Sequence, residues 1–252
     1  MKILVCLKQV LAAEAAGREL APRESDYRLN RFDEHALEEA LKLKESRPET
    51  RVEVLTVGPE RAAGVLRRGL GMGADHGIHL LTAGPPPADP HQLAVLIASQ
   101  AAGRGHDLIF TGVMAEDTQR GQVGVMLAAI LGRPWSTAVV AIDGRPAAGE
   151  IIVTRELEGG ARERLALELP ALLTIQAGGN RPRYPTLSGM LRAREQELET
   201  IAAASVILPP PRQESGWTAP PVRRRQGLVL TGSPAVKAAR LLAILRQRGL
   251  VS

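Results

Sequence analysis

Aromatic residues are scarce in this sequence: Trp, Tyr and Phe together make up 2% of its 252 residues. Proteins that bind single-stranded nucleic acid stack bases on aromatic side chains, and such a platform has almost no material here. The formal net charge of +5 comes largely from arginines scattered along the chain, without a lysine-rich block. A dedicated nucleic-acid-binding function is therefore not expected.

Cysteine is limited to Cys6, which excludes an internal disulfide and any zinc site built on cysteines. Cys6 lies in the first apolar run, where burial is the usual state. No apolar run approaches the roughly 18 residues that span a bilayer, and the N-terminus becomes charged too early for a secretory signal. We therefore expect a cytoplasmic protein without membrane insertion.

Catalytic signatures are also missing, because the sequence contains no GxSxG, HExxH or cysteine–histidine motif. Its five histidines are scattered. His76 and His79 are three residues apart around a predicted strand, which places them on opposite faces and argues against a metal pair. The sequence predicts no catalytic residues and no metal site.

Strands and helices alternate four times in the first half of the chain. The apolar runs 2–7, 52–57, 78–81 and 108–110 have the length of buried strands, and a helical pattern follows each of them. Such alternation predicts right-handed crossovers and a parallel sheet with helices on both faces. After Pro134, the β-rich runs 137–142, 151–155 and 164–167 are separated by turn residues typical of antiparallel hairpins. The expected fold is a doubly wound, mostly parallel α/β sheet with an antiparallel edge.

Two regions depart from this alternation. The segment 12–29 lacks clear periodicity, which predicts a long loop or a marginal hairpin. Residues 208–225 contain five prolines and four arginines, which predicts an extended arm before a last helix that begins at Ser233-Pro234. We expect one main α/β domain, residues 1–207, followed by a C-terminal arm and helix, residues 208–252.

The stretch 107–132 carries the strongest ligand signal. Its strand is followed by a polar loop and a helix, and at such a junction the unpaired N–H groups of the helix attract anions. Gly121 and Gly124 allow backbone to approach a ligand, while Thr118, Gln119 and Gln122 offer hydrogen bonds. A phosphate site is one interpretation. Tight turns and a capped helix are the other, since the pattern matches neither GxGxxG nor GxxxxGK[ST].

Four stretches favour the phosphate interpretation: LNRFDEHALEEALKLKE; LRRGLGMGADHGIHL; DLIFTG with AEDTQRGQVGVMLAAILG; and VTRELEGG leading through LPALLTIQAGGNRPRYPTLSGMLRAR. In order and spacing they resemble the beta subunit of an electron transfer flavoprotein. The resemblance implies a Rossmann-like fold of the adenine-nucleotide alpha-hydrolase kind. It also implies a heterodimer whose alpha partner carries most of the FAD site, while the beta subunit holds an AMP without redox chemistry.

The resemblance further implies an electron carrier without catalytic residues of its own. Flavin dehydrogenases, such as acyl-CoA dehydrogenases, would reduce the flavin, and a quinone oxidoreductase or another acceptor would oxidise it. By position, Cys6 and Val57 lie beside the adenine, and the loop after the strand at 108–110 surrounds the ribose and phosphate. The implied nucleotide contacts are Cys6, Asn30, Arg31, Phe32, Asp33, Val57, Gly112, Ala115, Asp117, Thr118, Gln119, Arg120, Gly121, Gln122, Val123 and Gly124. From the residues alone, Asn30 is also a candidate helix cap.

Residues 180–199 resemble the family's recognition loop, which docks dehydrogenases through a leucine set in an apolar pocket. Leu187 occupies that position, with Tyr184, Pro185 and Met190 beside it. An exposed apolar anchor can dominate an interface. The alternative is that Leu187 packs on its own domain. The run after it is mixed in charge where the family is often lysine-rich, so the partner can differ from a common acyl-CoA dehydrogenase.

Other departures leave alternatives open. Where family members often have a second acidic residue in the phosphate loop, this chain has Gln119, followed by Arg120, which favours an anion. The loop after the first strand is short, so flavin contacts from this chain are uncertain. A bifurcating beta subunit with a second FAD in place of AMP is the nearest alternative. A nucleotide-binding regulator of the universal stress protein kind and a self-sufficient enzyme are the others.

Overall fold

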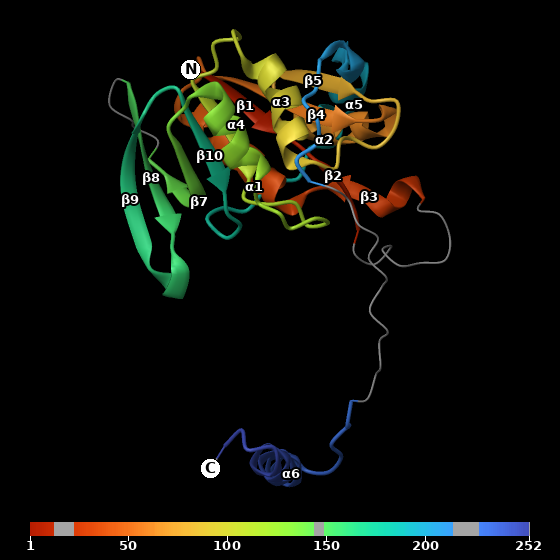
Figure 1. Ribbon diagram of the computed structural model, residues 1–252, viewed down its shortest axis with the longest axis vertical. Coiled ribbons are helices and arrows are strands. Elements are labelled where there is room, and N and C mark those ends of the chain that lie inside the picture. The colour runs from red at the N-terminus through yellow and green to blue at the C-terminus, as the bar shows by residue number, and fades with distance from the viewer. Residues whose placement is uncertain (13–22, 144–148, 214–226, 252) are drawn as a thin grey trace. The chain divides into compact units, whose positions relative to one another are not determined.

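The computed structural model describes residues 1–12, 23–143, 149–213 and 227–251 (Figure 1). Its contacts divide the chain into two units, residues 1–216 and 217–252. A domain boundary at residue 207 therefore stays a prediction. Within the described ranges, no helix has the combination of length and apolar character that crossing a bilayer requires.

The first unit is built on a nine-stranded sheet. Seven strands run parallel, while β8 and β9 extend one side as antiparallel strands, so the predicted sheet with an antiparallel edge is confirmed. The strand order is β11 (Glu199–Ala202), β5 (His76–Leu81), β4 (Arg51–Gly58), β1 (Lys2–Cys6), β6 (Leu108–Gly112), β10 (Ala171–Ile175), β7 (Trp135–Ile142), β8 (Glu150–Glu156) and β9 (Arg162–Glu168).

Helices cover both faces of the sheet, as expected for a doubly wound fold. Neighbouring residues of a strand point to opposite faces, so a strand with helices on both sides is apolar throughout. In β1, Ile3 packs in the cluster formed with α1 (Arg31–Ser46), α2 (Ala63–Met72) and α5 (Leu187–Glu195). Its neighbour Leu4 packs in the cluster formed with α3 (Pro90–Ala101) and α4 (Val123–Leu131). Figure 1 shows α3 and α4 side by side over that second face.

The segment after β1 forms a short hairpin from β2 (Gln9–Leu11) and β3 (Tyr27–Leu29). The hairpin interpretation is therefore confirmed at its two ends, whereas residues 13–22 lie outside the described residues. Strand β11 was not among the predicted strands. Short 3-10 turns occupy η1 (Glu24–Asp26), η2 (Glu60–Ala62), η3 (Glu158–Gly160) and η4 (Ala203–Ser205).

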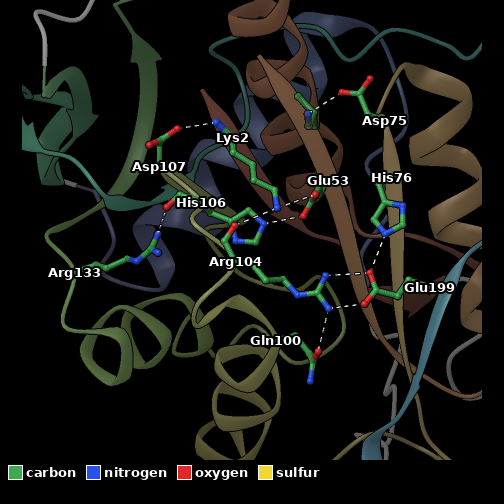
Figure 2. A network of polar contacts seen from close by, with 11 residues as sticks. Lys2, Glu53, Asp75, His76, Gln100, Arg104, His106, Asp107, Arg133 and Glu199 are labelled. Atoms are coloured by element: carbon green, nitrogen blue, oxygen red, sulfur yellow. Dashed lines mark hydrogen bonds and ion pairs between the residues drawn. The ribbon is translucent and has the colours of Figure 1, made fainter. Parts of the chain in front are cut away.

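Charged side chains cross-link the amino ends of the parallel strands (Figure 2). Glu53 of β4 accepts from Lys2 Nζ at 3.0 Å and from His106 Nε2 at 2.8 Å. Glu199 of β11 pairs with both terminal nitrogens of Arg104 and with His76 Nε2 at 2.9 Å. Hydrogen bonds from Arg104 hold the pKa of Glu199 down at about 2. We call this set of contacts the amino-edge network.

The second unit contains α6 (Pro234–Gln247), which confirms the predicted last helix. Ser233 accepts a hydrogen bond from the Val236 N–H at 3.4 Å, and Pro234 follows at the first helical position, where its missing N–H costs nothing. Val236, Leu241 and Leu242 are exposed.

Candidate functional site

A pocket of about 340 Å³ opens at the carboxyl ends of β1, β4 and β6, which contribute Cys6, Val57 and Gly112 to its lining. This is where open parallel sheets bind ligands. Two other hollows, of about 600 and 580 Å³, share Arg31 and are lined largely by polar and charged side chains. Of these three pockets, the one at the strand ends joins apolar side chains of β4 and α3 to the residues at the start of α4.

The polar wall of the pocket is the loop that leads into α4. Gln122 stands at the N-cap position of α4 and makes no side-chain capping bond. Among the described residues, no protein acceptor meets the N–H groups of Gln122, Val123 and Gly124. A Cβ at Gly124 would lie 2.7 Å from Thr111 Oγ1, so only glycine lets this turn sit so close to β6. Free N–H donors and the positive end of a helix dipole are the features on which anion sites at helix N-termini are built.

Asp33, in the first turn of α1, ties that helix to two strand ends. Its carboxylate accepts from the Lys8 N–H at 2.7 Å and from the Gly112 N–H at 3.0 Å. A Cβ at Gly112 would lie 2.5 Å from Asp33 Oδ1, so the close approach depends on that glycine. Burial raises the pKa of Asp33 to about 7, although these N–H bonds and the Asn30 side chain oppose the shift. Asp33 is therefore a structural clamp at the floor of the pocket.

Asn30 binds the loop between β6 and α4, residues 113–122, which we call the phosphate loop. Its amide donates to the Met114 carbonyl at 2.9 Å and accepts from the Glu116 N–H at 3.1 Å. It stands at the N-cap position of α1 but makes no side-chain capping bond there. Asn30 is therefore the N-cap residue of α1, as predicted, but its side-chain amide bonds to a loop 84 residues away in sequence and not to the N–H groups of the helix.

Lys8 is a site residue that the sequence did not reveal. Its ammonium pairs with Asp117 at 2.6 Å, linking the second residue after β1 to the phosphate loop. The available signal was its place directly after a buried strand, on the edge where the loop lies. The pair neutralises Asp117, which reduces that carboxylate's repulsion of a bound anion.

The inner part of the pocket is apolar. Leu55, Val57, Leu93 and Ile97 line it between the sheet and α3. Cys6 is buried there, and burial raises the pKa of its thiol far above the usual range. A thiol that stays protonated is a poor nucleophile. This slot can hold a flat apolar ring but offers no nucleophile of its own.

The nucleotide contacts implied by sequence fall into two groups. Arg31, Phe32 and Gln119 do not line the pocket, and Gln119 instead takes a left-handed conformation with φ 52° in the loop. Those that line it are Cys6, Asn30, Asp33, Val57, Gly112, Ala115, Asp117, Thr118, Arg120, Gly121, Gln122, Val123 and Gly124. Lining residues that the sequence did not single out include Lys8, Arg61, Pro86, Pro87, Ala88, Leu93, Ile97 and Met114.

The predicted docking residues lie at the start of α5, away from this pocket. Leu187 is 79% exposed and Tyr184 is 85% exposed, so the alternative that Leu187 packs on its own domain is not what the structure shows. Thr186 caps α5 by accepting from the Gly189 N–H at 3.0 Å. The loop therefore presents one leucine at a well-capped helix start.

Close backbone packing holds α5 on α2. A Cβ at Gly189 would lie 2.6 Å from the Gly71 carbonyl, and a Cβ at Gly71 would lie 2.5 Å from Met190 Sδ. Before α5, Nε and Nη2 of Arg183 donate to the buried carboxylate of Glu38. Its Nη1 donates to Glu45 Oε1 at 2.6 Å. These contacts fix the loop around Leu187 to α1 and α2.

Comparisons with known proteins agree with this geometry. The family model described as "Electron transfer flavoprotein domain" matches residues 18–206. The chain is 35% identical over 238 residues to the electron transfer flavoprotein subunit beta of Bradyrhizobium diazoefficiens, covering 90% of this chain and 92% of the relative. It is 32% identical to the Bacillus subtilis subunit beta, covering 90% and 89%. With the Methylophilus methylotrophus subunit beta the identity is 29%, and each chain is covered over 98%.

Proposed function

The chain belongs to the electron transfer flavoprotein beta-subunit family, and from that premise we propose that it holds AMP in the pocket at the carboxyl edge of its sheet. Beta subunits of this family pair with an alpha subunit and serve electron transfer. In the proposed complex the FAD is bound mainly by the alpha partner. The AMP has a structural role and takes no part in redox chemistry.

One observation carries the nucleotide proposal: Gln122, Val123 and Gly124, whose N–H groups have no acceptor among the described residues, line the same pocket as an apolar slot. A phosphate fits the first, because three donors and a helix dipole converge there. A purine ring fits the second, between Val57 and the side chains of α3. The residues present therefore suit an adenine mononucleotide.

The shape of the pocket favours AMP over a second FAD. Its volume of about 340 Å³ is at the lower end of the range of roughly 300–1,000 Å³ for small-molecule sites. Arg120 donates to the Ala88 carbonyl at 2.7 Å, so the phosphate loop and the proline-rich loop before α3 meet across its outer end. A dinucleotide would have to separate them.

When bound in the complex, FAD supplies the electron-accepting chemistry. The residues of this chain position and dock. The buried Cys6 thiol is unreactive, and Asp33 is fully engaged by backbone N–H groups, so we assign neither a catalytic role. The chain acts as a carrier subunit.

We assign dehydrogenase docking to Leu187, with Tyr184, Pro185 and Met190 around it. An exposed leucine on a capped helix start is suited to fill an apolar pocket of a partner. Flavin dehydrogenases, such as acyl-CoA dehydrogenases, donate electrons in this scheme, and a quinone oxidoreductase or another acceptor receives them.

The test is to co-express the chain with an alpha-type subunit, purify the complex, denature it and count the released nucleotides by chromatography. One FAD and one AMP per heterodimer are expected. Two FAD and no AMP would instead identify a bifurcating type. If no adenine nucleotide other than one FAD is released, the assignment of the pocket is wrong.

A further inference from the structure

The first residues of the C-terminal arm lie against the loop that walls the pocket. Gln92 of α3 donates to the Pro209 carbonyl at 2.7 Å, and the Arg212 N–H donates to Asp89 Oδ2 at 2.8 Å. Three consecutive prolines, 209–211, keep this part of the arm extended and leave it no N–H groups of its own to satisfy. The arm is thus fixed at two points before it reaches Gln213.

Gln213 then bridges two residues of the phosphate loop. Its side-chain carbonyl accepts from Arg120 Nη1 at 3.3 Å, and its amide donates to Gln122 Oε1 at 3.2 Å. Arg120 and Gln122 line the pocket, whereas Gln213 is not among its lining residues. The arm therefore braces the point where the two loops meet.

Asp89 accepts hydrogen bonds from both α3 and the arm. Its Oδ1 accepts from the His91 N–H at 3.2 Å, which caps α3, and its Oδ2 holds the arm. The hydrogen bond from the Arg212 N–H lowers the pKa of Asp89, so the carboxylate is charged at neutral pH. Hydrogen bonds to an ionised acceptor are stronger than neutral ones.

We propose that residues 209–213 are a latch that slows the entry and release of the nucleotide, with Gln213 as a positioning residue for Arg120 and Gln122. This inference rests on the proposed function, because it needs a nucleotide in the pocket. A ligand leaves only when the phosphate loop separates from the proline-rich loop before α3, and the latch joins them.

The test measures exchange of radiolabelled AMP on the purified heterodimer, with a chase of excess unlabelled AMP. Gln213→Ala removes both side-chain hydrogen bonds, so the release of AMP should be about tenfold faster. Gln213→Glu keeps the acceptor for Arg120, so its rate of AMP release should lie between those of wild type and Gln213→Ala. Asp89→Ser keeps a helix cap but loses the arm contact, and should also accelerate release.

The latch has a kinetic signature that a general destabilisation of the binding site lacks. Association and dissociation of AMP should both accelerate in Gln213→Ala, so the Kd should change less than the release rate. Gln100→Ala, an amide at the amino edge of the sheet, is the matched control and should exchange at the wild-type rate. If wild type holds AMP and Gln213→Ala releases it no faster, the latch is refuted alone. If wild type holds no AMP, the proposed nucleotide site fails, and the latch with it.

Discussion

The two edges of the central sheet handle their polar groups in opposite ways. At the amino edge, Lys2, His106, Arg104 and His76 each meet the carboxylate of Glu53 or Glu199 (Figure 2). At the carboxyl edge, the N–H groups at the start of α4 have no partner among the described residues. Buried or half-buried polar groups need partners. Among the described residues, the edge that lacks such partners is the one where the pocket opens.

The carboxyl groups at the two edges also differ in their pKa values. Glu199 is held charged by Arg104, and its pKa falls to about 2. Asp33 is buried, and burial raises its pKa to about 7 despite its backbone N–H bonds and the nearby charge of Lys8, whose ammonium pairs with Asp117. An ion network stabilises one edge, while the other keeps a carboxyl group near its titration point.

The largest expected effect is on the pH dependence of stability at the carboxyl edge. The raised pKa means that the folded state binds a proton on Asp33 that the unfolded chain has released, so this contribution falls as pH rises from about 4 to about 7. Asp33→Asn cannot titrate and mimics the protonated acid. Relative to wild type it should gain about 1.4 kcal/mol of unfolding free energy per pH unit across that window. Urea denaturation at pH 5, 6 and 7 measures this, and parallel profiles would contradict it.

A smaller effect is expected at Gly124, which lets the start of α4 lie close to β6. In Gly124→Ala the new Cβ would overlap Thr111 and Thr174, each at 2.7 Å, and overpacking of this kind costs about 1–3 kcal/mol. The start of α4 should shift, and the complex should lose AMP as well as stability. Gly64→Ala in α2 is the control, because no atom lies within 4 Å of its Cβ position, and it should gain about 0.4–1 kcal/mol. Thermal melting and nucleotide content check both variants. If Gly124→Ala is destabilised but keeps its AMP, the close packing at Gly124 is not needed for binding.

The smallest effect is expected at the amino edge. Glu199→Gln removes the charge that pairs with Arg104 and His76, but the Glu199 side chain is 34% exposed, and such pairs contribute only about 0.2–1 kcal/mol. Because its pKa is lowered, the contribution is present above about pH 4.5 and is lost as the pH falls toward 2. Urea denaturation should show a small loss at pH 7 and none near pH 2, with AMP content unchanged. A loss of AMP would mean that the two edges are coupled.

The sequence predicted the parts of this fold that depend on local pattern. Buried strands such as β6 are continuous apolar runs between turn residues, and α4 shows a clear apolar face, so the strand–loop–helix junction at the pocket was predictable. Strand β11 was not, because its four residues become a strand only by pairing with β5. Short polar segments carry no such information alone.

The site shows the same limit. Glycines that allow close approach, such as Gly124, were found from the motif. The partners of Asn30 and Lys8 were not, since each bonds across 84 or more residues of sequence. Nor could the contact of Gln213 with Arg120 be read from an arm that looks like a linker. A hydrogen bond between distant segments depends on the final packing, which no local pattern encodes.

The contact between Gly71 and Gly189 has a consequence for recognition. Because the backbones of α2 and α5 touch there, the segment around Leu187 is ordered before any partner arrives. A flexible loop would lose conformational entropy on binding, at about 1–2 kcal/mol for each residue that becomes fixed. Most of that loss has already occurred during folding, so a small contact can suffice for a brief encounter. If Leu187 docks a partner as proposed, two glycines without side chains thereby lower the entropic cost of that contact.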